Sequence, residues 1–580
     1  MDRAASPDDS GVERLAALLD EAKRLVDWLH ERVAPPDAAV PPGESGFKGK
    51  GLLHTLKLML ARTLDDPSSL ATHYAKFASV VLDAAQQKLD LEPDAGDRRF
   101  KDPLWRTSPL HRTLLQVYLG WQRTLGEWAR AQHFTPEDEV RVQFVLDQLV
   151  AALAPSNLPL NPAALKRAET TEGASVVNGI KQWADDVVHR RAMPQQIRSD
   201  AFRVGEDLAT TPGAVVHRHP LFELIEYASS TPTVHRKPLL MVPPQINKFY
   251  IFDLRPENSL FRYLVEQGIH LFCVSWRNPD AAMRDAGLED YVQATLQAIE
   301  VVRSISRAAS IGVVSACAGG LTAISAMGLL AMRRERAVAH HSLLVTAPLA
   351  GNGSVLEAFA SRETMLAAAD WSRQRGHMEG ADLARVFAWL RPNDLVWNYW
   401  VNNYLMGRRP PSLDVLYWDN DSTRLPAALQ RDFIDMIDRR VFERPGALTL
   451  AGTPIDFRKL RIDGYYVGGR EDYLMPWQGV YRAARHFGTR RTFVLSTSGH
   501  VQSIVRPPSL GRTEYFSRED LPPDPQAWFD GAETRKGSWW PHWAGWLAER
   551  SGPRVKARKA PGSAAYAPIM PAPGAYVMDA

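Results

Sequence analysis

A thiol, a carboxylate and an imidazole occur along this sequence in an order that suits nucleophilic catalysis: Cys317, Asp472 and His500. A cysteine thiol is only a few per cent ionised near neutral pH, so a base such as histidine must accept its proton. A carboxylate then holds the histidine in the correct tautomer and stabilises its cation. Because each residue follows a short apolar run, we expect all three just beyond strands. The pattern predicts a Cys-His-Asp triad.

The segment VVSACAGGLTA, residues 313–323, surrounds the candidate nucleophile. Its first residues favour a strand and its last residues a helix, with small residues at the sharp turn where the two elements nearly touch. Backbone N–H groups at the start of a helix would stabilise a thiolate at Cys317. The alternative is an ordinary core cysteine in an Ala/Gly-rich helix start, since cysteine is often buried.

The segments GGREDYLMPW (468–477) and STSGHVQS (496–503) supply the acid and the base. Each is unremarkable alone, because acidic residues in turns and single histidines in loops usually face water. Their order after the nucleophile is that of α/β-hydrolases, in which nucleophile, acid and histidine follow successive strands. Two backbone donors to the oxyanion are then expected: the N–H of Ala318, and one near Ile246 in the loop MVPPQINKFY.

A sheet must position these residues, and after residue 200 short apolar runs do alternate with helical stretches such as 260–266 and 291–304. This alternation predicts a doubly wound α/β sheet. A mostly helical, Trp- and Asn-rich stretch at about 350–445 predicts an insertion over the sheet. The strands are expected at 239–242, 270–276, 310–315, 342–347, 464–467 and 492–495.

Two domains are expected. Residues 1–197 have helical periodicity and no chemical motif, so they predict a mostly α-helical N-terminal domain. Residues 198–580 form the catalytic domain, whose Pro/Ala-rich end, about 552–580, is expected to be an extended tail. Helices in the first domain are expected at 11–34, 51–63, 68–90, 109–131 and 137–153, with a Pro/Gly-rich linker after the first.

Composition excludes several classes of protein. The 580 residues are 45% hydrophobic and 23% charged, which is typical of globular proteins. A net charge of +3 provides no field that would draw the chain to nucleic acid or to an anionic membrane. Two cysteines exclude a disulfide scaffold and a Cys-rich zinc module, and Cys273, inside an expected strand, is interpreted as a core residue. With no signal-peptide pattern and no transmembrane run, a cytoplasmic protein is expected.

A series of motifs resembles the polyhydroxyalkanoate synthase family. The resemblance covers nearly all of residues 200–580 and rests on the order of the motifs. They are PPQINKFYIFDLRPENSLFRYLVEQG (243–268), VSWRNPD (274–280), the segment around Cys317, FAWLRPNDLVWNYWVNNYL (387–405), LYWDNDSTRLP (416–426), GTPID (452–456), GGREDYLMPW (468–477), SGHVQSIVRPP (498–508) and GSWWPHWAGWL (537–547).

The resemblance implies an α/β-hydrolase fold with a helical cap insertion and an acyltransferase that polymerises (R)-3-hydroxyacyl-CoA into polyester. The family's catalytic residues correspond to Cys317, Asp472 and His500, so Asp472 is preferred to its neighbour Glu471. An arginine suggested to meet CoA corresponds to Arg391. CoA is then a leaving group, and no metal or cofactor is expected. The resemblance further implies a homodimer on cytoplasmic polyester granules, and several short motifs lie closer to the medium-chain-length subgroup.

Two departures from the family pattern stand near the nucleophile. Ser315 replaces the usual first glycine of the elbow, and Leu349 replaces an aspartate after the next strand. We expect altered turn geometry and packing rather than loss of activity. Two alternatives stay open: a thioesterase or polyester depolymerase on the same fold, in which water attacks the acyl-enzyme, and an inactive granule-associated relative.

Aromatic residues of the insertion have two expected roles. Some would exclude water from the acyl-enzyme, although ordinary core packing is the competing explanation. These are Trp389, Trp397, Tyr399 and Trp400. The Trp-rich insertion, including Trp418, is expected to help form the homodimer, since amphipathic aromatics are enriched at interfaces.

Overall fold

The computed structural model describes residues 52–94, 96–190, 193–349, 351 and 362–579. The helix predicted over 11–34 and the linker after it lie outside the described residues, as do residues 352–361 of the predicted insertion. None of the described helices is long and apolar enough to cross a membrane.

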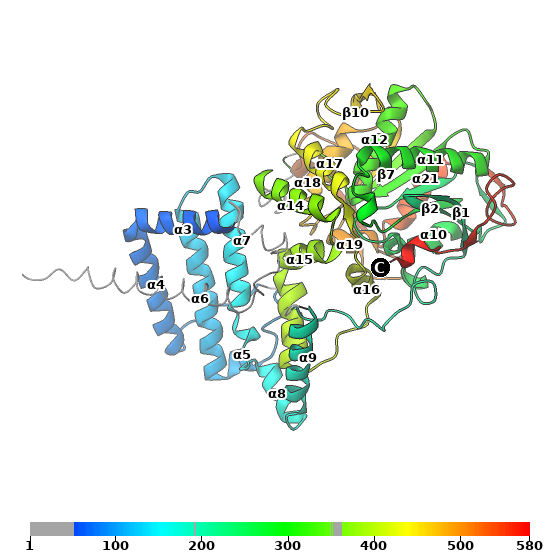
Figure 1. The fold of residues 1–580 in the computed structure, drawn as a ribbon. Helices are drawn as coiled ribbons and strands as arrows, with labels where there is room; N and C mark the ends of the chain where they lie inside the picture. The colour runs from blue at the N-terminus through cyan, green and yellow to red at the C-terminus, as the bar shows by residue number, and fades with distance from the viewer. Residues whose placement is uncertain (1–51, 95, 191–192, 350, 352–361, 580) are drawn as a thin grey trace, which may run out of the picture.

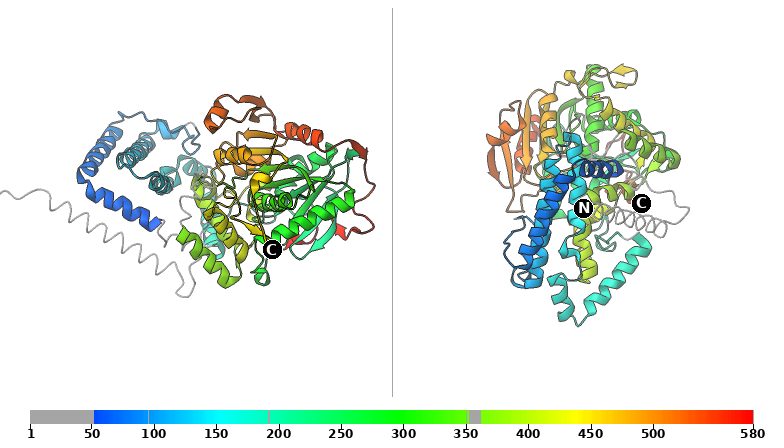
Figure 2. Two further views of the ribbon diagram at one scale, coloured as in Figure 1. Left: turned by 90° about the horizontal axis from the view of Figure 1, so that it is seen from above. Right: turned by 90° about the vertical axis from the view of Figure 1, so that its left-hand side faces the viewer.

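The described part of the N-terminal region is helical, as predicted. Figures 1 and 2 show its helices, coloured blue to cyan, to one side of the part that contains the sheet. Several begin with proline at the first turn, where its missing N–H is not needed: Pro67, Pro109, Pro136 and Pro162. The elements are α3 (Leu52–Asp65), α4 (Pro67–Ala85), α5 (Leu104–Thr107), α6 (Pro109–Ala131), α7 (Pro136–Ala152), η1 (Pro155–Asn157), α8 (Pro162–Thr170) and α9 (Ala174–Arg190).

Eleven strands of the described chain form one sheet in the order β15-β14-β13-β12-β7-β6-β4-β5-β2-β1-β17. The six neighbours from β13 to β5 run parallel and are the six predicted strands, although β7 starts and ends earlier than expected. The outer strands are antiparallel, and none of them was predicted. The strands are β1 (Gly213–His219), β2 (Phe222–Tyr227), β4 (Leu239–Val242), β5 (Leu271–Trp276), β6 (Ile311–Ala316), β7 (Val338–Leu344), β12 (Asp463–Gly469), β13 (Arg491–Ser496), β14 (Glu514–Arg518), β15 (Glu533–Lys536) and β17 (Met570–Pro571).

Both faces of the central sheet are buried. In β4, Leu240 and Val242 belong to one core with residues of helices α11, α12 and α18, whereas Leu239 and Met241 belong to a second core with residues of α10 and α21. Burial on both faces explains why the parallel strands are continuous apolar runs in the sequence. The doubly wound α/β sheet is confirmed. These helices are α10 (Leu260–Glu266), α11 (Leu288–Ser306), α12 (Cys317–Met332), α18 (Trp477–His486) and α21 (Trp540–Arg550).

The insertion between β7 and β12 is mostly helical in its described part. It is fastened to the N-terminal region, because Tyr404 donates a hydrogen bond to Asp186 (2.8 Å) and the side chain of Gln196 donates to the Leu395 carbonyl (2.7 Å). Its elements are α14 (Arg362–Arg375), β8 (His377–Met378), α15 (Gly380–Leu390), η5 (Asn393–Trp397), η6 (Trp400–Leu405), α16 (Asp414–Asn420), β9 (Leu425–Pro426), α17 (Ala427–Asp438), β10 (Thr449–Leu450) and β11 (Thr453–Pro454).

The C-terminal segment predicted as a tail is extended, but it packs against the sheet edge. Two buried carboxylates on β2 hold its backbone: Glu226 accepts from the N–H of Gly562 (2.6 Å), and Glu223 accepts from the N–H groups of Ala575 (2.8 Å) and Tyr576 (3.0 Å). Strand β17 adds to β1, and β16 (Arg554–Lys556) pairs with β3 (Thr233–His235). The segment therefore completes the edge of the sheet.

Candidate active site

The turn from β6 into α12 places Cys317 in a strained backbone conformation. Its φ is +47°, in the left-handed region that non-glycine residues seldom adopt. The next turn of helix runs so close to β4 that a Cβ on Gly319 would lie 2.5 Å from the carbonyl oxygen of Pro243. A Cβ on Gly320 would lie 2.5 Å from the Thr346 side chain. The small residues in the sequence thus allow the close approach that a nucleophile elbow needs.

The Cys317 side chain is a free, partly exposed thiol at the first position of α12. The helix dipole there favours a negative charge. Its neighbour Ser315 is buried, and its hydroxyl has no hydrogen-bond partner among the described residues. Leu349 packs into the core formed with α11 and α12. Both residues that depart from the family pattern are therefore buried, Ser315 with a hydroxyl that is unpaired within the described chain and Leu349 as an apolar core residue.

Asp472 and His500 come together at the ends of β12 and β13. His500 opens the short helix α19 (His500–Ile504), and its Nδ1 lies 2.7 Å from Asp472 Oδ2. The other carboxylate oxygen accepts from the N–H groups of Leu474 and Met475, each at 2.9 Å. Because an ionised carboxylate only accepts, the proton is on Nδ1, and Nε2 is left for another partner.

Burial of His500 lowers its pKa, but the charges of Asp472 and Cys317, and the hydrogen bonds of His500 to both, outweigh burial and raise that pKa to about 10. The imidazole is thus within reach of both candidate partners and is stabilised as its cation between them. The structure brings the three predicted residues into one cluster, although they are spread over 184 positions of the chain (500 − 317 + 1).

The carboxylate next to Asp472 in the sequence, that of Glu471, faces solvent. Glu471 is exposed, whereas the Asp472 side chain is completely buried. The backbone N–H of Glu471 donates to the Ser498 carbonyl (3.1 Å), which ties the acid loop to the histidine loop. Only Asp472 of the adjacent pair contacts the imidazole.

The two predicted oxyanion donors lie on adjoining segments. Ala318 follows the nucleophile, and Ile246 lies in the loop after β4, whose Pro243 abuts the start of α12. Within the described chain, neither the Ala318 N–H nor the Ile246 N–H donates a hydrogen bond to another residue. Both groups therefore stay available to a ligand.

Arg391 reaches the edge of this cluster from the insertion. Its Nη1 is 3.7 Å from the position that a Cβ would take on Gly499, the residue before His500. Its guanidinium carbon lies 5.4 Å from the centre of the Tyr473 ring, and it forms an ion pair with Asp394. The structure thus places the predicted CoA-contacting residue beside the histidine and acid loops.

Sequence reasoning missed Tyr473. Burial is the largest effect on its phenol and raises its pKa to about 12. Its ring lies beside the Arg391 guanidinium, directly after Asp472 in the acid loop. Its position directly after Asp472 is the signal that could have identified it.

Two of the aromatic residues predicted to exclude water, Trp389 and Trp400, contact the N-terminal region. Trp400 donates its indole N–H to the Asn157 carbonyl (3.1 Å), and its ring packs against Trp397 and Tyr404. Gln148 donates to the backbone carbonyl of Trp389 (3.0 Å). Trp400 and the Trp389 backbone therefore join the insertion to the N-terminal region.

Tyr399 and Trp418, two further aromatic residues of the insertion, are both buried. Tyr399 is buried, and burial raises its pKa to about 12, with Asp419 and Asp394 nearby. Trp418 is only 6% exposed, and its indole N–H donates to the Lys248 carbonyl (2.6 Å). The Trp418 ring is thus covered within the chain and is unsuited to supply interface surface, whereas the role of the insertion in a homodimer stays a prediction. Cys273 is fully buried in β5, as predicted.

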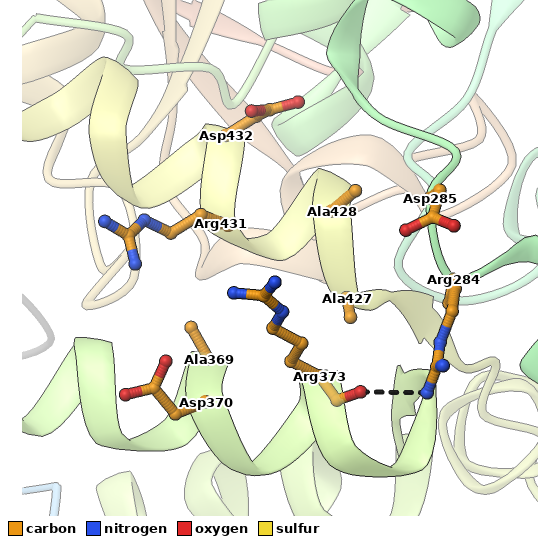
Figure 3. A pocket seen from close by; sticks show the side chains of 9 residues that line it. All are labelled: Arg284, Asp285, Ala369, Asp370, Arg373, Ala427, Ala428, Arg431 and Asp432. Carbon is orange, nitrogen blue, oxygen red and sulfur yellow. Dashed lines mark hydrogen bonds between the residues drawn. The ribbon is translucent and has the colours of Figure 1, made fainter.

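A separate pocket of about 480 Å³ lies between α14 and α17 (Figure 3). Side chains of both charge signs line it, and Arg373 and Arg431 project into the space between the helices. Neither Cys317 nor His500 contributes to its walls. The pocket is therefore distinct from the candidate triad.

Comparison with known proteins gives consistent matches. A family model described as Poly-beta-hydroxybutyrate polymerase (PhaC) N-terminus matches residues 96–264, and the alpha/beta hydrolase fold matches residues 238–507. Poly(3-hydroxyalkanoate) polymerase 1 of Ectopseudomonas oleovorans is 43% identical over 92% of this chain and 96% of its own. The Poly(3-hydroxyalkanoate) polymerase subunit PhaC of Cupriavidus necator is 37% identical over 92% and 91%, respectively.

Among solved structures, a monoacylglycerol lipase of Paleococcus ferrophilus aligns with 57% of this chain and 99% of its own, at 11% identity and a TM-score of 0.31. The alpha/beta hydrolase match spans the strained turn at Cys317, and the relatives match over more than nine-tenths of this chain. This chain belongs to the poly(3-hydroxyalkanoate) polymerase family.

Proposed function

We propose that this enzyme polymerises (R)-3-hydroxyacyl-CoA into polyester through an acyl-Cys317 intermediate. Family membership supports the overall reaction. The observation that carries the mechanism is the His500–Asp472 hydrogen bond of 2.7 Å beside the left-handed Cys317. This arrangement supplies a nucleophile, a base and an orienting acid in one cluster.

The first half-reaction transfers the acyl group to the enzyme. His500 Nε2 takes the proton of Cys317, and the thiolate sulfur attacks the thioester carbon. The negative oxygen of the tetrahedral intermediate accepts hydrogen bonds from Ala318 and Ile246 N–H. The bond from carbon to the CoA sulfur then breaks, and CoA leaves with the proton from His500. Because one thioester replaces another, this exchange is nearly isoenergetic.

The second half-reaction lengthens the chain. A hydroxyl group at the growing end gives its proton to His500, and its oxygen attacks an acyl thioester. An ester C–O bond forms, a C–S bond breaks, and the released sulfur recovers the proton. Neither half-reaction as written requires a metal or a prosthetic group, and CoA enters only as the leaving group of the substrate.

We further propose that the enzyme takes medium-length acyl chains, acts as a homodimer and works in the cytoplasm at the surface of its polyester. Motif similarity to the medium-chain-length subgroup supports the preference for medium-length acyl chains. Arg391 beside the histidine loop is suited to contact CoA, since a guanidinium pairs well with phosphate. Light scattering of the active enzyme tests the dimer, and a purely monomeric active species would contradict it.

The decisive experiment incubates the purified enzyme with C4 and C10 3-hydroxyacyl-CoA and follows CoA release and polymer together. We expect CoA release with retained polymer, faster with C10, and an acyl group on Cys317 found by mass spectrometry of quenched enzyme. CoA release with free hydroxy acid would indicate a hydrolase. No release would indicate an inactive relative. A Cys317→Ala variant with wild-type CoA release would refute the covalent mechanism.

A further inference from the structure

The loop that carries the candidate oxyanion donor Ile246 has little regular structure of its own. It connects β4 to the short helix η2 (Phe249–Phe252). Asn247 has a φ of +69°, so the backbone turns sharply immediately after the donor. Asparagine tolerates this conformation better than most residues, so the turn itself is compatible with the sequence. The contacts of the loop with its surroundings then decide how it is held.

Thr423, a buried residue of the insertion, contacts the backbone on both sides of Ile246. Its hydroxyl oxygen accepts a hydrogen bond from the N–H of Asn247 (2.8 Å), and the hydroxyl donates to the carbonyl of Gln245 (3.1 Å). One hydroxyl group therefore fixes the two peptide units that flank the α-carbon of Ile246.

The Gln245 carbonyl and the Ile246 N–H belong to the same peptide unit. In a trans peptide these two groups point in opposite directions. Holding the carbonyl toward Thr423 therefore directs the N–H of Ile246 to the opposite side, away from the insertion segment that holds it. Within the described chain that N–H donates to no other group.

Further contacts from the same insertion segment limit movement of the loop. Lys248 forms an ion pair with Asp421 (2.7 Å), and the Lys248 carbonyl accepts from the indole of Trp418 (2.6 Å). From the other side, Gln245 donates its amide to Thr322 of α12 (2.9 Å). The loop is thus fixed both to the insertion and to the helix that begins at Cys317.

We infer that Thr423 is a positioning residue that orients the Ile246 N–H toward the oxyanion of the acyl-transfer step. This inference rests on the proposed function, because it assumes attack by Cys317 on a thioester. Thr423 itself touches neither the substrate nor the reacting sulfur. Its effect passes through the peptide unit between Gln245 and Ile246.

The test replaces the hydroxyl while keeping the shape, with Thr423→Val, and restores the hydroxyl with Thr423→Ser. The matched control is Thr295→Val in α11, where a fully buried threonine also donates to a backbone carbonyl (Tyr291, 2.8 Å). Each variant is assayed for the CoA burst with C10 3-hydroxyacyl-CoA and for alkylation of Cys317 by iodoacetamide. Alkylation needs the thiolate but creates no oxyanion, so the two readouts separate positioning from general damage.

We expect Thr423→Val to slow the burst about 10- to 100-fold, at unchanged KM and unchanged alkylation rate, since a misplaced donor weakens the transition state. Thr423→Ser and Thr295→Val should stay within about threefold of wild type, which is small beside the loss of one oxyanion donor. An unchanged burst in Thr423→Val, or an equal loss of burst and alkylation, overturns the inference. Failure of the proposed function is recognised separately, because wild-type enzyme would then form no acyl-Cys317.

Discussion

The Asp472→Asn substitution tests the orientation of the imidazole. Asp472 Oδ1 is fixed by the N–H groups of Leu474 and Met475, so an asparagine would keep its carbonyl oxygen there. Its amide nitrogen would then face His500 Nδ1 in place of the carboxylate oxygen that now lies at 2.7 Å. An amide N–H donates, so Nδ1 becomes an acceptor and the ring proton moves to Nε2. In that tautomer His500 is unable to take the proton of Cys317.

The expected loss is large. The pKa of His500 rises from 6.5 to about 10, which corresponds to roughly 5 kcal/mol in favour of its cation. Asp472 is the largest favourable contributor, Cys317 shares the effect, and burial of the imidazole opposes both. We expect kcat/KM for acylation to fall about 10⁴-fold, or about 5 kcal/mol, as for the corresponding change in serine-enzyme triads.

The assay measures the CoA burst by stopped flow and polymer growth at steady state, with Glu471→Gln as the control. Glu471 is exposed, so its variant should retain nearly full activity. The melting temperature of Asp472→Asn should fall, because the variant loses the charge that stabilises the His500 cation. Circular dichroism at the assay temperature, well below that melting temperature, checks that the variant is folded. If Asp472 also helps to activate the incoming hydroxyl, the variant should accumulate acyl-enzyme. An inactive Glu471→Gln together with an active Asp472→Asn would refute this reasoning.

Three further predictions concern the elbow and the core. Cys317→Ala should abolish CoA release while leaving the melting temperature near wild type, and measurable turnover would contradict its role. Gly319→Ala should lower both stability and expression of folded enzyme, because its Cβ would lie 2.5 Å from the backbone of Pro243; a wild-type melting temperature would show that the elbow yields easily. Burial lowers the pKa of His340 to about 3 and that of His341 to about 4, so only the unfolded chain binds these protons near pH 5. The contribution of these two histidines to stability should therefore be complete above about pH 6.5 and decline as the pH falls toward 4, and melting scans of His340→Leu over that range should show a shallower decline than wild type.

The central strands could be predicted because both of their faces are apolar, whereas the edge strands could not. Strand β2 reads FELIEY, in which Glu223 and Glu226 interrupt the continuous apolar run that marks the central strands. All six of its residues are buried, and backbone N–H groups of the C-terminal segment donate to both carboxylates. The signal for this strand is therefore in residues 562–576, far from the strand itself.

The candidate triad could be predicted because chain order and strand ends identify it without any knowledge of packing. Thr423 could not, since it acts on a loop 176 positions earlier in the chain, and a threonine in a Trp- and Asp-rich segment carries no local signal. Trp418 misled the prediction because an aromatic side chain suits a core as well as an interface. The hydrogen bond from its indole N–H to the Lys248 carbonyl shows that Trp418 is a core residue.

The two carboxylates of β2 also constrain how the chain acquires its fold during translation. Glu226 receives its backbone donor from a residue 336 positions downstream, and Glu223 from residues 352 and 353 positions downstream. Until the ribosome has synthesised those residues, two acidic groups on β2 lack the amide donors that compensate their burial. Until then, among the partners described for these carboxylates, the nascent chain supplies Arg218 to Glu223 and His270 to Glu226, but none of the C-terminal amides. Docking of the C-terminal segment onto β2 is therefore a late step, and contacts between residues so far apart in the chain form slowly.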